Sequence, residues 1–162
     1  MKYLLIFLFF ISFTISCNHN KKKVVKILEN ENIKPPPPPR IIDENSLVGF
    51  GCYYSGRKSK PVEIITEILE NKKYEELKIK LYSQKSAEKY LSTFACIELS
   101  KKNLIHLSEI QLKQVVLNKQ SNLKVSFCGG CTESENYNLY ELFSEKIDFI
   151  NQVESWFKEI KK

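Results

Sequence analysis

Five cysteines are the residues of this 162-residue chain whose type and spacing could do chemistry. Cys128 and Cys131 are separated by two glycines, and this C-x-x-C spacing occurs in disulfides, in thiol–disulfide exchange and in metal sites. Cys52 and Cys96 stand alone, and Cys17 follows an apolar amino-terminal stretch. A zinc site normally needs a second pair of ligands. We therefore expect neither a metal nor another cofactor.

The amino-terminal stretch has the features of an export signal. A basic residue precedes fourteen uncharged residues, 3–16, which are fewer than the ~20 apolar residues of a membrane-spanning helix. Thr14-Ile15-Ser16-Cys17 resembles the lipobox of bacterial lipoproteins, although Thr14 replaces the usual branched aliphatic residue. The resemblance implies that residues 1–16 are a lipoprotein signal peptide, and that acylated Cys17 attaches the protein to an envelope membrane. The alternative is an ordinary cleaved signal.

A tether is expected to follow, at residues 17–40. It is rich in lysine and contains Pro35–Pro39, and five successive prolines favour a stiff polyproline II segment. We interpret these prolines as a spacer; the alternative is a docking ligand for an aromatic groove. The use of Lys, Asn and Ile resembles that of AT-rich bacteria such as the Bacteroidetes.

Residues 41–162 are expected to form one globular domain. They contain 18 basic and 17 acidic residues, and this near-neutral balance argues against a nucleic-acid partner. Apolar residues at helical spacing predict a mainly α fold, a compact helical bundle. Alternation at 123–127 predicts a short strand, with 48–54 as a candidate partner in a β-hairpin-like pair. Helices are expected near residues 60–71, 74–81, 87–99, 108–118 and 149–160, and the fourth begins with a capping box at Ser108 and Gln111.

The centre of the domain resembles a HEAT or armadillo-type helical repeat. Residues 74–81 correspond to the first helix, residues 83–86 to the tight turn and residues 87–99 to the inner helix. The resemblance implies HEAT-like helix pairs and a protein-binding scaffold that carries no catalytic residues. The apolar residues of 108–118 fall on two sides, so we expect that helix to be sandwiched between other elements.

The cysteines of the globular part allow several chemistries. An exported chain meets an oxidising compartment, so the candidate disulfide cysteines, Cys52, Cys96, Cys128 and Cys131, have three possible pairings. A strand before Cys128-Gly-Gly-Cys131 and a helical segment after it resemble a thioredoxin-type redox site. That resemblance implies thiol–disulfide exchange, but the chain lacks the family's βαβ pattern and its proline beside the thiols. Cys96 either contacts a second packing surface or is an exposed thiol.

Other candidate residues are polar or aromatic. Glu98 lies within an apolar stripe, so it is either a cleft carboxylate of raised pKa or a structural acid paired with a lysine. His106 is interpreted as a solvated loop residue rather than a base. The candidate interaction surface consists of four tyrosines in or near irregular segments: Tyr53, Tyr54, Tyr137 and Tyr140.

These features favour a non-enzymatic adaptor that binds an unidentified envelope protein. Two alternatives remain. One is an immunity or inhibitor lipoprotein that acts against a toxin, and the other is a thiol–disulfide redox protein that uses the Cys128 and Cys131 pair.

Overall fold

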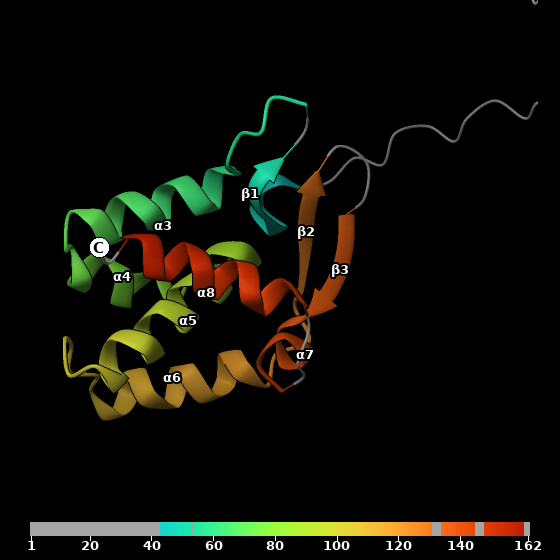
Figure 1. Cartoon of the computed structure of the whole chain (residues 1–162). Coiled ribbons are helices and arrows are strands. Elements are labelled where there is room, and N and C mark those ends of the chain that lie inside the picture. The colour runs from blue at the N-terminus through green and yellow to red at the C-terminus, as the bar shows by residue number, and fades with distance from the viewer. Residues whose placement is uncertain (1–42, 53, 131–133, 145–147, 161–162) are drawn as a thin grey trace, which may run out of the picture. The chain divides into compact units, whose positions relative to one another are not determined.

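The computed structural model describes residues 43–52, 54–130, 134–144 and 148–160, all within the unit Ile41–Lys162. Cys17, the signal segment and the tether lie outside the described residues. The described strands form a sheet at one side of a group of helices (Figure 1). The elements follow the order η1 (Glu44–Ser46), β1 (Leu47–Cys52), α3 (Lys60–Glu70), α4 (Tyr74–Lys80), α5 (Ser86–Lys101), α6 (Glu109–Lys119), β2 (Lys124–Gly130), β3 (Ser134–Asn138), α7 (Leu139–Ser144) and α8 (Asp148–Ile160).

The predicted mainly α fold is confirmed, and the local signals at helix starts explain why. Ser59 precedes α3, and Pro61 occupies its first turn, where a missing N–H costs nothing. Before α6, the Ser108 Oγ accepts a hydrogen bond from the Gln111 N–H at 3.3 Å, and the Gln111 Oε1 accepts one from the Ser108 N–H at 2.9 Å. This is the predicted capping box.

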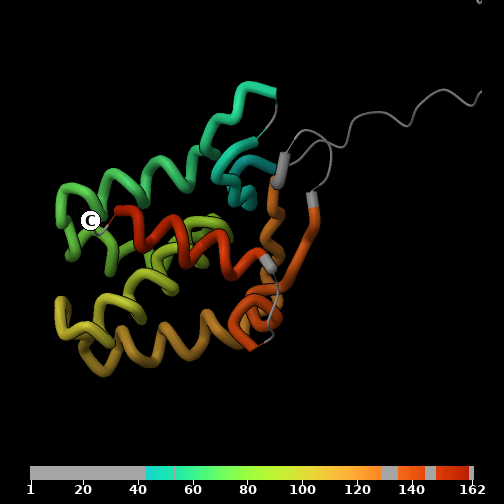
Figure 2. Tube along the Cα trace, viewed as in Figure 1, coloured from blue at the N-terminus to red at the C-terminus, as the bar shows by residue number. Residues whose placement is uncertain are grey.

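The sheet has the order β1-β2-β3, with β2 in the middle. The pairing of the segments near 48–54 and 123–127 is confirmed, but its expected hairpin-like form is wrong, because β1 runs parallel to β2. A parallel pair needs a crossover connection, and here helices α3 to α6 supply it (Figure 2). β3 pairs antiparallel with β2. The sequence pattern did not predict β3, because Ser134–Asn138 contains no alternation of apolar and polar residues.

The main hydrophobic core lies between the sheet and the helices. Val48, Val125 and Phe127 face it from the strands, and Tyr90, whose exposed fraction is 1%, enters it from α5. Because successive strand residues point to opposite faces, their neighbours face the other side of the sheet. There Leu47 and Cys128 form a separate buried cluster with Cys52, which a register shift between Gly49 and Gly51 brings to the same side.

Helices α4, α5 and α8 contribute further side chains to the core. α4 and α5 pack against each other at the residues predicted for a HEAT-like pair; membership of that repeat class stays a prediction. Cys96 on α5 is fully buried. Of the two expectations for this thiol, contact with a second packing surface of its helix is confirmed, and exposure to solvent is wrong. α8 crosses in front of α5 in Figure 1, and its Phe157 ring meets Phe94 edge-on, with 5.9 Å between the ring centroids.

Candidate functional site

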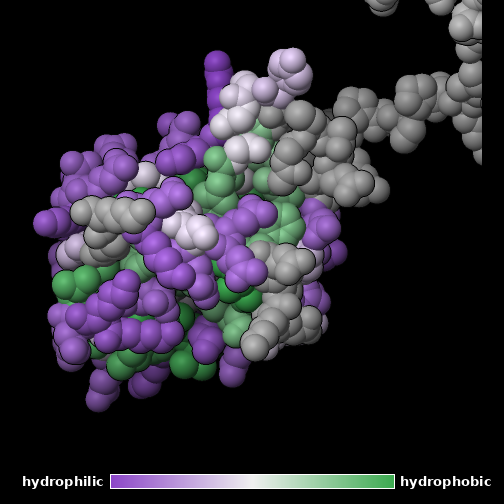
Figure 3. All heavy atoms as spheres, viewed as in Figure 1, coloured by the Kyte–Doolittle hydropathy of each residue, from purple (hydrophilic) through white to green (hydrophobic). Residues whose placement is uncertain are grey.

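The outward side of α6 carries large apolar side chains that are uncovered within the described part of the chain, and the charged residues Glu109 and Lys113 are exposed on the same side. We call it the outer α6 face; it consists of Ile110, Leu112, Val116 and Leu117, whose exposed fractions are 70%, 49%, 50% and 61%. α5 and α7 pack against α6 from the other side, where Val115 is buried. The expected sandwich is therefore wrong for the described part of the chain, where helices cover only one side of α6. Figure 3 shows hydrophobic side chains along the lower edge of the molecule, over α6.

A buried amide holds α6 in place. The Asn118 Nδ2 donates hydrogen bonds to the Leu81 carbonyl at 2.9 Å and to the Thr93 hydroxyl at 2.8 Å. The Asn118 Oδ1 accepts one from the Gln114 Nε2 at 2.8 Å. Because Asn118 is 1% exposed, these bonds are shielded from water, and each is costly to lose. The outer α6 face is therefore presented by a helix in a fixed orientation.

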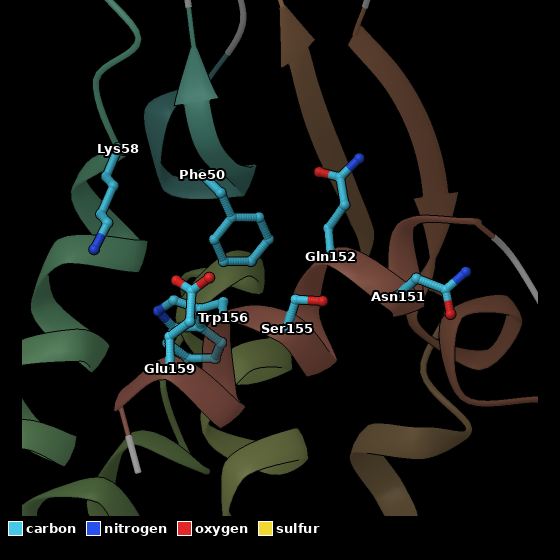
Figure 4. A pocket seen from close by; sticks show the side chains of 7 residues that line it. All are labelled: Phe50, Lys58, Asn151, Gln152, Ser155, Trp156 and Glu159. Atoms are coloured by element: carbon cyan, nitrogen blue, oxygen red, sulfur yellow. The ribbon is translucent and has the colours of Figure 1, made fainter. Parts of the chain in front are cut away.

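A shallow cleft of about 360 Å³ lies between β1 and α8. Its apolar floor is Phe50 and Trp156, whose ring centroids are 5.6 Å apart. The Trp156 indole N–H already donates to the Thr66 hydroxyl at 2.9 Å, so the cleft offers an aromatic surface and no indole donor. Figure 4 shows Phe50 pointing from β1 toward Trp156, with a polar rim. The rim residues are Lys58, Asn151, Gln152, Ser155 and Glu159.

The predicted tyrosine surface is divided. Tyr54 is 99% exposed in the turn after β1, and Tyr140 is 39% exposed on α7. Tyr137 on β3 is half-buried, and its ring lies 6.0 Å from the Phe127 ring between centroids. Tyr137 therefore contributes to packing, while Tyr54 and Tyr140 present more surface to solvent. Tyr53 lies outside the described residues.

The cysteines fall into separate environments. Cys52 and Cys128 come together across β1 and β2, and the Cys52 thiol donates to the Cys128 carbonyl at 3.9 Å. Cys96 lies in the main hydrophobic core cluster, whereas Cys52 and Cys128 belong to the smaller cluster. Burial, assisted by a hydrogen bond and charge interaction with the Cys128 side chain, raises the pKa of Cys52 to about 12. Burial likewise raises the pKa of Cys96 to about 12. Cys131 is outside the described residues.

The acidic residue that is buried is not the one considered from the sequence. Glu98 is 27% exposed, and its Oε1 lies 2.7 Å from the Lys101 Nζ, as in the interpretation of a structural acid paired with a lysine. Glu88 is 3% exposed, with its Oε2 3.0 Å from the Lys80 Nζ. Its position in the first turn of α5 was the available signal. His106 is exposed in the connection before α6.

A metal-binding cluster and a membrane-spanning helix are both absent among the described residues. Among them, no group of His, Cys, Asp or Glu has an arrangement that could hold a metal ion. None of their helices combines the length and the apolar character needed to cross a bilayer. No protein-family model, curated protein or solved structure matches the chain.

Proposed function

We propose that this protein is a lipid-anchored, non-enzymatic binding domain of the bacterial envelope. In this proposal, acylated Cys17 holds the chain on the membrane, residues 17–40 form a spacer, and the globular domain binds another envelope protein. The observation that carries the binding role is the outer α6 face, four large apolar side chains that are 49–70% exposed on one helix. Several large apolar side chains exposed on one helix favour an interaction site.

The chemistry of this face supports a partner that has an apolar surface. Ile110, Leu112, Val116 and Leu117 offer hydrocarbon, and Lys113 is exposed on the same outward side. Burying one such side chain contributes about 1.5–3 kcal/mol. A helix-bearing envelope protein with an apolar stripe fits this face, because a helix presents such residues at i, i+3, i+4 and i+7.

The binding role is tested by crosslinking in intact cells, followed by capture of the protein from the envelope fraction. The double variant Ile110→Ser with Leu117→Ser is expected to recover the crosslinked partner about tenfold less well than the parent, or worse. The matched control is Ile79→Ser, because Ile79 is 69% exposed on α4. Equal recovery by the double variant, or equal loss by the control, would overturn the role of α6.

The anchor is tested separately, by the intact mass of protein extracted from membranes. An acylated chain that begins at Cys17 is expected. A Cys17→Ala variant is expected to leave the membrane fraction. If that variant stays membrane-bound, the anchoring proposal fails, whatever the crosslinking result.

The two alternatives make different demands. A redox enzyme that uses Cys128 and Cys131 needs a thiol of lowered pKa. Cys131 lies outside the described residues, and the exposed apolar side chains of α6 support binding instead. Measurable reduction of insulin by the purified chain would revive the redox alternative. An immunity lipoprotein would bind its toxin through an exposed surface, and a toxin gene beside this one would favour that variant of the binding role.

A further inference from the structure

A β-bulge brings two distant cysteines to the same face of the sheet. Gly49 pairs with Cys128 and Gly51 pairs with Gly129, so Phe50 is an extra residue in β1. An inserted residue reverses the side-chain alternation beyond it. Cys52 consequently lies on the same side of the sheet as Leu47 and Cys128 and shares a buried cluster with them.

Gly49 leaves the space that the Cys52 thiol fills. A Cβ on Gly49 would lie 1.9 Å from the Cys52 Sγ and 3.2 Å from the Cys128 Cβ. The Cys52 thiol therefore rests over the Gly49 backbone, beside Cys128. The two cysteines are 76 residues apart in sequence, and their exposed fractions are 1% and 8%.

We propose that Cys52 and Cys128 are the residues joined by a disulfide when the protein meets an oxidant. Among the cysteines that the structure describes, the geometry selects this pair because Cys96 is enclosed in the other hydrophobic cluster. Formation of the bond in cells rests on the proposed export of the chain, because disulfides persist in oxidising compartments. Its formation by the purified protein does not depend on export.

The oxidant is a low-molecular-weight or protein disulfide. The Cys128 thiolate attacks it, so one sulfur–sulfur bond forms as the oxidant's bond breaks and a thiolate leaves. Cys52 then attacks the mixed disulfide, and the second thiolate leaves. The two protons lost by Cys52 and Cys128 pass to the departing thiolates. The protein loses two electrons, and the oxidant gains them.

The bond would fasten the strand that follows the tether to the middle of the sheet. β1 begins at Leu47, so tension on a membrane-held amino terminus would pull β1 away from β2. Backbone hydrogen bonds alone resist such peeling one after another, whereas a covalent link between Cys128 in β2 and Cys52, the last residue of β1, would stop the peeling at the end of β1. The oxidised protein is therefore expected to unfold at a higher urea concentration than the reduced protein.

The experiment uses the full chain, purified in detergent, reduced, and then exposed to oxidised glutathione. After alkylation and tryptic digestion, mass spectrometry should find the peptide of residues 41–57 linked to that of residues 125–146. Because residues 125–146 contain both Cys128 and Cys131, variants assign the bond. Cys131→Ser should keep the linked species, and Cys128→Ser should lose it.

Cys96→Ser is the matched control, and it should keep the crosslink. A Cys128–Cys131 bond within one peptide would overturn the proposal, and so would glutathione adducts alone. Failure of the proposed export would show instead as an unprocessed chain in the cytosol whose purified form still makes the Cys52–Cys128 bond.

Discussion

Trp156 on α8 donates a hydrogen bond from its indole Nε1 to the Thr66 Oγ1 on α3, at 2.9 Å and across 90 residues of sequence. The Thr66 hydroxyl in turn donates to the Val62 carbonyl at 2.6 Å. Both side chains are buried, with exposed fractions of 4% and 7%. This bond fixes the last described helix to the first long one and sets the position of the aromatic floor of the cleft.

Thr66→Val should destabilise the protein by about 1–3 kcal/mol, because it leaves the buried Trp156 N–H without its acceptor while keeping the side-chain volume. Urea unfolding followed by tryptophan fluorescence measures this loss. Thr66→Ser keeps the hydroxyl and should cost no more than about 1 kcal/mol. Equal losses in the two variants would contradict the importance of the hydrogen bond, because only Thr66→Val removes the acceptor.

Glu88 should contribute to stability at neutral pH. Its Oε2 accepts a hydrogen bond from the Ser83 hydroxyl at 3.0 Å and lies 3.0 Å from the Lys80 Nζ, while its Oε1 is 3.4 Å from the Lys85 Nζ. Glu88→Gln should lower the free energy of unfolding by about 1–3 kcal/mol at pH 7. The matched control is Glu98→Gln, which breaks a more exposed pair with Lys101 and should cost at most about 1 kcal/mol.

The effect of Glu88 should depend on pH in one direction. Burial by itself raises the pKa of Glu88, but hydrogen bonds from Lys80 and Ser83 and the charges of Lys80 and Lys85 outweigh it and hold the pKa below 4.5. A lowered pKa stabilises the fold above the unfolded value, and that stability is lost as the pH falls through the folded value. The gap between the parent and Glu88→Gln should shrink below pH 4.5 in urea titrations; a constant gap would contradict the assignment.

Local sequence signals predicted where the helices begin better than they predicted which other elements pack against those helices. Pro61 after Ser59, and Ser108 with Gln111, act within a single turn, so their effects could be predicted from neighbouring residues. The Ser59 hydroxyl, however, does not cap α3. It donates to the Leu47 carbonyl at 2.9 Å, a contact that exists only once β1 lies beside the helix start.

Tertiary packing, which the sequence pattern does not show, determines which of the candidate residues are buried, exposed or brought together. Glu98 and Glu88 both lie on α5, and only the arrangement of neighbouring elements makes Glu88 the buried one. The approach of Cys52 to Cys128 depends on the extra residue at Phe50, and the sequence carries no signal for that bulge. The exposure of the outer α6 face likewise depends on where the other helices lie.

Asn118 should be one of the most sensitive polar positions. Asn118→Asp preserves the shape but removes both donors, and it sets a carboxylate beside the Leu81 carbonyl. We expect a loss of about 3 kcal/mol or more, because the buried carboxylate faces the Leu81 carbonyl oxygen and has the neutral donor of Gln114 in place of a counter-charge. Gln114→Ala, which removes only the donor to the Asn118 Oδ1, should cost about 1 kcal/mol. Urea unfolding at pH 7 measures both, and similar losses would contradict the central role of the Asn118 amide.

Gly49 and Cys52 should be energetically coupled. Gly49→Ala places a methyl group where the Cys52 thiol now lies, 1.9 Å from its sulfur, and such overpacking typically costs about 1–3 kcal/mol. Cys52→Ala removes the obstructing sulfur, so Gly49→Ala should cost less in that background. The Cys128 Cβ, 3.2 Å away, should leave part of the cost. A double-mutant cycle under reducing conditions measures the coupling without any crosslink, and strictly additive losses would show that the thiol does not occupy the space above Gly49.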